Sequence, residues 1–201
     1  TYVYLRTIYE LNKKYGFKKF VIVVPSVPIR EGVLKNLQIT HEHFQTLYDN
    51  TPIRFYVYDR TKISQLRGFA AGDNIEVLVI NIDSFAKDEN IINKANDRLS
   101  GQEPIRFIQQ VHPIVIVDEP QNMESEKRAA AIANLHPLCT LRYSATHRNR
   151  YNLIYSLNPV KAYDLGLVKQ IEVDSVFEEN SLNGAFISLE AITPTKSSIT
   201  A

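Results

Sequence analysis

Two continuous runs of apolar residues are the clearest features of the hydropathy pattern. They are "FVIVV" at 20–24, which Pro25 ends, and "PIVIVDE" at 113–119, which ends in two carboxylates. Continuous runs rich in β-branched residues are typical of strands buried on both faces of a parallel sheet. Further strands are predicted over residues 53–59, 76–82, 139–145 and 168–174.

The stretches between these strands carry apolar residues at helical spacing. In residues 2–15, Tyr4, Ile8 and Leu11 recur at this spacing, and Gly16 is a helix stop signal. Further helices are predicted over residues 28–37, 40–47, 61–70, 88–99, 124–135 and 150–157.

Strands that alternate with helices predict an α/β fold, in which helices cover both faces of a mostly parallel sheet. We expect this domain to span residues 1–175. From Phe177 onward the pattern changes to one predicted strand at 185–191 and a polar tail rich in Thr, Ser and Pro. Residues 176–201 are therefore expected to form a linker or the beginning of another domain.

The bulk composition agrees with a soluble protein but says little about its ligands. Of the 201 residues 44% are apolar and 22% are charged, and the net charge of +1 gives no argument for nucleic acid. The single cysteine, Cys139, excludes an internal disulfide, and we expect it to be a buried, inert thiol in a strand. No apolar stretch reaches the roughly 18 residues of a membrane span, so we expect a cytoplasmic protein without a membrane partner.

Polar residues follow four of the predicted strands. They are Ser26, the pair Asp83 and Ser84, the pair Asp118 and Glu119, and the triplet Ser144, Ala145 and Thr146. In open α/β sheets, ligands bind outside the carboxyl ends of the strands. We therefore expect these four segments to converge on one edge of the sheet and to form a binding site there.

The acidic pair Asp118 and Glu119 allows two interpretations, because charges at the end of a buried strand are costly unless something pairs with them. In the catalytic one, the first carboxylate holds Mg²⁺, usually through water, and the second accepts a proton from an attacking water. In the structural one, the pair caps the following helix near its positive end. The preceding apolar strand and the later "SAT" favour the catalytic interpretation.

Several segments carry a family resemblance. "VDEPQ" at 117–121, followed by "YSATHR" at 143–148, resembles motifs II and III of superfamily 2 helicases and translocases, and "VIVVPSVPIREGV" at 21–33 is similar to their motif Ia. The forms "DEPQNMES", "LRYSATHR" and "PSVPIREGV", with the run 151–175, resemble the restriction (Res) subunit of bacterial Type III restriction-modification enzymes. This resemblance covers about residues 1–175 and implies a RecA-like domain of the P-loop NTPase type.

The resemblance implies a catalytic role for three residues. Asp118 would coordinate the Mg²⁺ bound to ATP, Glu119 would polarise the attacking water, and Gln121 would bind the nucleotide by sensing its γ-phosphate. A second implied set couples the state of the nucleotide to the grip on DNA: Ser144, Ala145 and Thr146.

The resemblance also implies contacts with DNA from the motif Ia segment. Ser26 and Arg30 would touch the DNA backbone, because a short hydroxyl and an arginine next to a helix start suit phosphate oxygens. Ser84 occupies a similar position after its strand. The alternative interpretations are a solvated helix residue for Arg30 and a helix or turn cap for Ser84.

The phosphate-binding loop of P-loop NTPases, with the pattern G-x-x-x-x-G-K-[ST], does not occur in the chain. In the family this loop precedes a helix like residues 2–15, so we interpret Thr1 as its final, nucleotide-binding threonine. The strand that feeds the loop is then missing too, and we expect a gap between strands 113–119 and 139–145. Without the loop, this chain alone is not expected to hydrolyse ATP efficiently.

The predicted function is that of an ATP-dependent DNA translocase or helicase motor domain of a Type III restriction endonuclease subunit. ATP and Mg²⁺ are the implied cofactors. Double-stranded DNA, the methyltransferase (Mod) subunit and the remainder of the Res chain are the implied partners, and a separate nuclease domain would cut the DNA. Two alternatives stay open: another superfamily 2 motor, such as a Type I restriction motor or repair helicase, and a non-catalytic RecA-like binding module.

Overall fold

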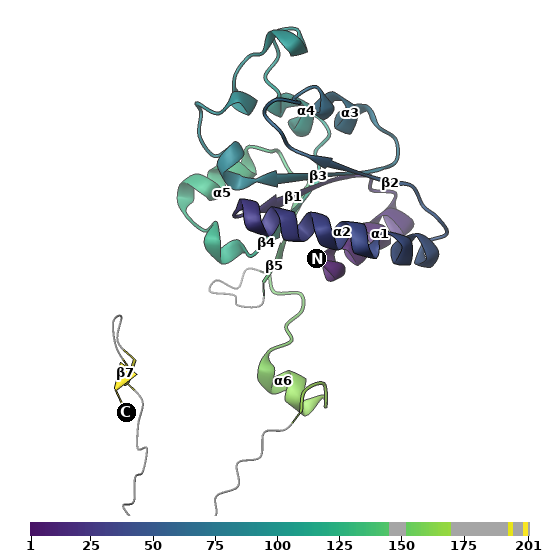
Figure 1. The fold of residues 1–201 in the computed structure, drawn as a ribbon, viewed down its shortest axis with the longest axis vertical. Helices are drawn as coiled ribbons and strands as arrows, with labels where there is room; N and C mark the ends of the chain where they lie inside the picture. Colours follow the sequence, from purple (N-terminus) through teal and green to yellow (C-terminus); the bar gives the residue numbers. More distant parts are fainter. Residues whose placement is uncertain (145–151, 170–192, 195–198, 201) are drawn as a thin grey trace, which may run out of the picture. The chain divides into compact units, whose positions relative to one another are not determined.

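The computed structural model describes residues 1–144, 152–169, 193–194 and 199–200 (Figure 1). The chain divides into two compact units, Thr1–Ile154 and Tyr155–Ala201. The described part of the second unit holds helix α6 (Pro159–Asp164) and a short antiparallel pair, β6 (Thr193–Pro194) and β7 (Ile199–Thr200). The predicted boundary at residue 175, the predicted strand 185–191 and most of the predicted strand 168–174 lie outside the described residues.

The predicted α/β fold is confirmed, since five strands of the first unit form one parallel sheet. They are β1 (Lys19–Val24), β2 (Ile53–Val57), β3 (Ile75–Asn81), β4 (Ile114–Asp118) and β5 (Cys139–Tyr143). The order β2-β3-β1-β4-β5 places β1 at the centre of the sheet. Residues 20–24 of β1 are fully buried, which agrees with their continuous apolar run.

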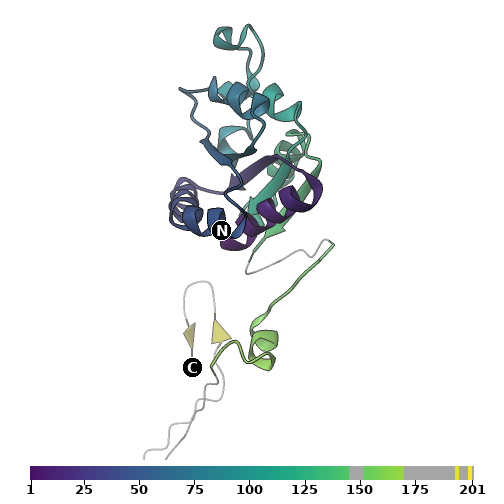
Figure 2. The same ribbon diagram turned by 90° about the vertical axis from the view of Figure 1, so that its right-hand side faces the viewer.

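Helices cover both faces of the sheet. One face packs against α1 (Tyr2–Tyr15) and α2 (Val27–Leu47), and the other against α3 (Gln65–Ala71), α4 (Ile105–Gln109) and α5 (Glu126–Ala133). Figure 1 shows α1 and α2 on the opposite side of the sheet from α3 and α4, and Figure 2 gives the view from the side. Because all five strands are parallel, their carboxyl ends lie at one edge of the sheet.

The expected gap between the strands of motifs II and III is wrong. β4 and β5 pair directly, in a parallel register that runs from Ile114 opposite Cys139 to Asp118 opposite Tyr143. Hydrogen bonding between the two backbones leaves no room for a strand between them. The unpaired edge of the described sheet on this side is instead the outer edge of β5.

The prediction of a buried Cys139 is also wrong. Cys139 and Thr140 are both exposed, and only the second half of β5 is partly buried. The physical reason is that β5 lies at the edge of the described sheet, so its first residues have a neighbouring strand on one side only.

The prediction of a helix over residues 88–99 is wrong, because two 3₁₀ turns, Ile91–Asn93 and Asp97–Leu99, occupy this region. The side-chain amide of Asn90 donates to the Asp83 carbonyl at 2.8 Å, and that of Asn93 donates to the Lys87 carbonyl at 2.8 Å. Such local bonds to the backbone compete with a helix, which periodicity alone does not reveal. Helix α4, which follows, was not predicted.

Two helix boundaries also differ from the prediction. Residues 28–37 and 40–47 belong to the single helix α2, in which the Thr40 hydroxyl donates to the Asn36 carbonyl at 2.7 Å. The described residues between 152 and 158 are not helical, and α6 begins only at Pro159. There the Asn158 side chain caps the helix by accepting from the Lys161 N–H at 2.8 Å.

Among the residues that the structure describes, no helix is both long enough and apolar enough to cross a membrane.

Candidate active site and nucleic-acid interface

The carboxyl ends of β1, β3, β4 and β5 lie on one edge because the strands are parallel. This confirms that the four predicted polar segments begin at the same edge of the sheet. Of the coupling triplet, only Ser144 is described, since Ala145 and Thr146 lie outside the described residues. The structure brings two of the segments into contact, and these form the acidic corner: Asp118, Glu119, Gln121 and Ser144.

Asp118 is the last residue of β4 and is partly buried. Its pKa is raised by burial and by the charge of Glu119, while a hydrogen bond from Tyr4 opposes this shift. The Tyr4 hydroxyl lies 3.5 Å from Asp118 Oδ2 and 3.1 Å from Thr1 Oγ1. Thr1, Tyr4 and Asp118 therefore form one small cluster at the end of the strand.

Glu119 has an unusual backbone conformation. Its φ of 53° and ψ of 59° are left-handed, which costs a residue other than glycine or asparagine about 1 kcal/mol or more. The Glu119 N–H still donates to the Tyr143 carbonyl at 3.0 Å, so the β4–β5 pairing continues one residue past the strand. Six other described residues that are not glycine, among them Ser100 and His136, also have a positive φ, so this conformation alone does not mark a functional site.

The side chains of the acidic corner form a hydrogen-bonded network. Gln121 donates its amide to Glu119 Oε2. The Ser144 hydroxyl lies 2.8 Å from Gln121 Oε1 and 3.3 Å from Glu119 Oε2. A hydroxyl has a single proton to donate, so the shorter contact with Gln121 is the stronger of the two. The network joins the segments after β4 and β5.

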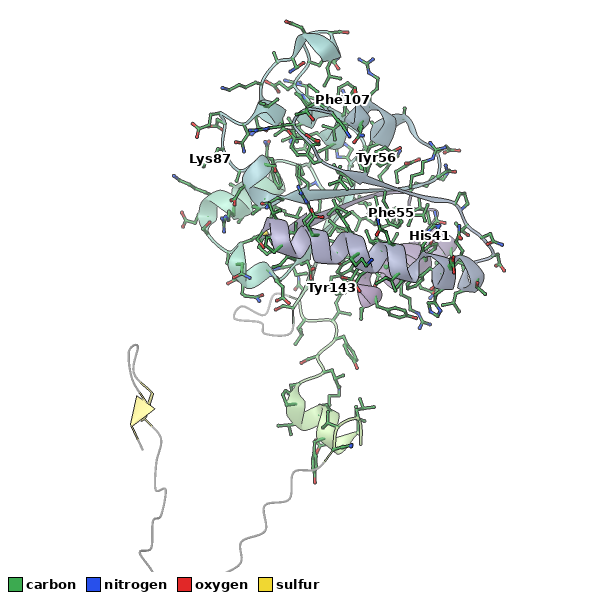
Figure 3. The ribbon with its side chains drawn as sticks, viewed as in Figure 1. His41, Phe55, Tyr56, Lys87, Phe107 and Tyr143 are labelled. Carbon is green, nitrogen blue, oxygen red and sulfur yellow. The ribbon has the colours of Figure 1, made fainter. Side chains whose placement is uncertain are left out.

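A layer of aromatic residues under the acidic corner was not predicted. Tyr4 and Tyr143 meet edge to face with ring centroids 5.6 Å apart, and the Tyr143 hydroxyl donates to Thr7 Oγ1 at 2.8 Å. Figure 3 labels Tyr143 at this end of the sheet. The helical spacing of Tyr4 indicated a core residue, but nothing local indicated that its hydroxyl would reach Asp118.

An ion pair next to the corner was also missed. Arg142 of β5 donates to Glu124 at 2.7 Å, and the two side chains are 28% and 20% exposed. This pair ties the turn after β4 to β5. No sequence signal joins the two residues, because their contact depends on the pairing of the strands.

The predicted DNA-contact residues lie elsewhere along the same edge. Ser26 is the residue before α2, and its side chain makes no capping hydrogen bond. Arg30 and Ser84 both line a cleft of about 1020 Å³ at the ends of β2 and β3, which does not include the acidic pair. The side chain that caps the turn of Ser84 is Asn81, which accepts from the Asp83 N–H at 2.9 Å. The structure thus places Arg30 and Ser84 in one cleft, apart from the acidic corner.

The acidic corner fits the requirements of Mg²⁺ with a nucleotide better than those of a metal held by protein alone. Among the described residues, no group of three or more His, Cys, Asp or Glu side chains could hold a metal ion. Mg²⁺ keeps several waters and is commonly bound through one or two carboxylates together with substrate phosphates. The Asp118 carboxylate is the donor that suits this arrangement.

Comparison with known proteins supports the resemblance seen in the motifs. The family model described as "Type III restriction enzyme, res subunit" matches residues 1–149. The match includes the segments after β1, β3, β4 and the start of the segment after β5.

Three curated relatives that the chain matches are Res subunits of Type III restriction-modification enzymes. The chain is 30% identical over 193 residues to the Type III restriction-modification enzyme EcoP15I Res subunit of Escherichia coli, a match that covers 85% of this chain and 20% of the relative. It is 31% identical over 193 residues to the EcoPI Res subunit of Escherichia phage P1, with the same coverage. It is 29% identical over 209 residues to the StyLTI Res subunit of Salmonella typhimurium, covering 86% of this chain and 21% of that subunit. The chain therefore spans about a fifth of the length of these relatives.

Proposed function

This chain belongs to the family of Type III restriction enzyme res subunits, and from this premise we propose that it forms the first RecA-like domain of an ATP-dependent DNA motor. ATP turnover at the acidic corner would drive movement or switching on double-stranded DNA. The family membership supports a Type III system over the alternatives of a Type I motor or a repair helicase. The methyltransferase (Mod) subunit and the remainder of the Res chain are the proposed partners, and cleavage is assigned to another domain.

The observation that carries this proposal is the network of Glu119, Gln121 and Ser144. A general base must be held in one orientation to accept a proton from water. Glu119 Oε2 already accepts from the Gln121 amide, which leaves Oε1 as the oxygen for the attacking water.

The same network suggests how a change in the bound nucleotide would reach the segment after β5. Gln121 bonds to both Glu119 and Ser144, so a change in what Gln121 contacts would change the bond with Ser144. Mg²⁺ held through Asp118 would neutralise charge on the phosphates of ATP. Ser144, with Ala145 and Thr146, would pass the change on to the part of the protein that grips DNA.

Nucleotide binding requires a phosphate-binding loop in addition to the residues described here. We place Thr1 at the end of such a loop, because the Tyr4 hydroxyl joins Thr1 Oγ1 to the Asp118 carboxylate. The unpaired edge of β5 in the described sheet offers a position for the strand that would feed this loop.

Substitution Glu119→Gln tests the proposal in a protein that contains this chain together with a phosphate-binding loop. We expect ATP turnover to be lost, because an amide cannot accept the proton, while ATP binding measured by calorimetry stays close to that of the parent protein. Glu126→Gln is the matched control, since Glu126 is an exposed carboxylate in the first turn of α5. Unchanged turnover in Glu119→Gln would refute the catalytic role.

A further inference from the structure

A cleft of about 1020 Å³ lies at the carboxyl ends of β2 and β3, beside the first turns of α2. We propose that Arg60 and Lys62, on the loop after β2, bind the phosphates of a nucleic-acid strand that lies in this cleft. Both residues line the cleft together with Arg30 and Ser84. The choice of nucleic acid as the ligand rests on the proposed function, whereas the two cations come from the geometry of the cleft.

Arg60 and Lys62 are the cations of the cleft that are available to a ligand. Both side chains are exposed, and neither makes an ion pair with any described residue. Arg30 pairs with Glu31 at 2.9 Å, but Glu31 is 60% exposed, so this pair is weak and a phosphate can replace it. The cleft can therefore present three cations to one bound strand.

The acidic residues of the cleft have partners of their own. Asp83 accepts from the Arg128 guanidinium at 2.9 Å, and Glu89 lies 4.0 Å from the Lys87 ammonium. Asp59 accepts from the Thr61 N–H at 2.8 Å and from the Thr61 hydroxyl at 2.7 Å. The Thr61 donors are neutral, so the Asp59 carboxylate keeps its charge and interacts with the charges of Lys62 and Arg60. The lining holds three cations and three carboxylates, of which Asp83 is paired with Arg128.

The loop holds its two cations in a defined place. The bonds from Thr61 to Asp59 fix the turn between Arg60 and Lys62, and the Lys62 N–H donates to the Asp59 carbonyl at 2.9 Å. A ligand that binds here finds the backbone of the loop already ordered, which lowers the entropic cost of binding.

The size and lining of the cleft suit an extended polyanion. Its volume of about 1020 Å³ lies at the upper end of the range for sites that enclose a small ligand. The Ser84 hydroxyl and the Gln65 amide add the polar groups that usually contact phosphate and sugar. Tyr56 of β2, labelled in Figure 3, also lines the cleft, and its ring packs edge to face against Phe69.

The test compares the full chain with its double variant Arg60→Ala/Lys62→Ala, using a fluorescein-labelled single-stranded oligonucleotide of mixed sequence and its duplex. Binding is measured by anisotropy over a series of salt concentrations. We expect the double variant to bind about tenfold more weakly at low salt, with a shallower salt slope. The slope should fall by about 0.7 per lost phosphate contact for the single strand, or about 0.9 for the duplex.

The matched control is the double variant Lys35→Ala/Lys127→Ala, which also removes two positive charges. Both lysines are exposed on helices, and neither lines the cleft. A loss confined to Arg60→Ala/Lys62→Ala supports the inference. An equal loss in the control, no binding by the parent chain, or equally strong competition by poly-glutamate would each overturn it.

Failure of this inference can be told apart from failure of the proposed function. If Glu119→Gln abolishes ATP turnover but the double variant binds DNA normally, the motor assignment stands and the cleft assignment falls. If the double variant loses binding but Glu119→Gln leaves turnover unchanged, the cleft is a nucleic-acid site and the catalytic assignment falls.

Discussion

The acidic corner and the cleft lie on the same edge of one sheet, yet their polar residues are arranged in opposite ways. In the corner, the side chains of Glu119, Gln121 and Ser144 bond to one another above a packed aromatic layer. In the cleft, Arg60 and Lys62 face solvent without an ion pair among the described residues. Proton transfer requires groups that are fixed before the substrate arrives, whereas a grip on phosphates works through charges that stay solvated until binding.

The two regions should therefore respond differently to substitution. A change in the corner should affect the free energy of unfolding or the rate of turnover. A change in the cleft should affect DNA affinity and its salt dependence, with little effect on folding.

The largest effect is expected from Tyr4→Ala, which leaves a cavity under Asp118. Tyr4 is only 1% exposed, so the free energy of unfolding should fall by about 3–5 kcal/mol, measured by urea denaturation. Tyr4→Phe keeps the ring and should cost only about 1 kcal/mol for the lost hydrogen bonds. Arg60→Ala should stay within about 0.5 kcal/mol of the parent. A large stability loss in Arg60→Ala would break the contrast between the regions.

A smaller effect is expected from Ser144→Ala, in a protein that hydrolyses ATP. The substitution removes the hydroxyl that bonds to Gln121 Oε1, and a lost bond of about 1.4 kcal/mol corresponds to roughly tenfold slower turnover. Ser144→Thr retains a hydroxyl and should recover most of the rate. If Ser144→Ala and Ser144→Thr hydrolyse ATP equally slowly, the loss of rate comes from altered packing at this position and not from the missing hydroxyl.

The smallest effects concern two ion pairs, one next to the acidic corner and one in the cleft. A double-mutant cycle on Arg142 and Glu124, whose side chains are 28% and 20% exposed, should give a coupling of about 1 kcal/mol. The same cycle on Arg30 and Glu31 should give less than about 0.5 kcal/mol, and added salt should reduce it further, because Glu31 is 60% exposed. Equal couplings, measured by urea denaturation, would show that the two regions do not differ in this respect.

Local pattern predicted the strands well because β1, β3 and β4, which are buried on both faces, each leave a short apolar run in the sequence. It failed for residues 88–99, where the amides of Asn90 and Asn93 bond to nearby carbonyls and stabilise 3₁₀ turns in place of a helix. It also failed for Cys139, since an apolar run does not reveal whether its strand lies at the centre or the edge of a sheet.

For the candidate site, the sequence alone determined which polar residues follow the strands, and therefore that Asp118, Glu119 and Ser144 share one edge of the sheet. Only the tertiary structure decided which of these residues touch, because strand order arises from packing between segments far apart in the chain. Direct pairing of β4 with β5 brings Glu119 to Ser144, 25 residues later, where a gap had been expected. The cations of the cleft also depend on tertiary structure, since the net charge does not show that Arg60 and Lys62 lie beside Arg30.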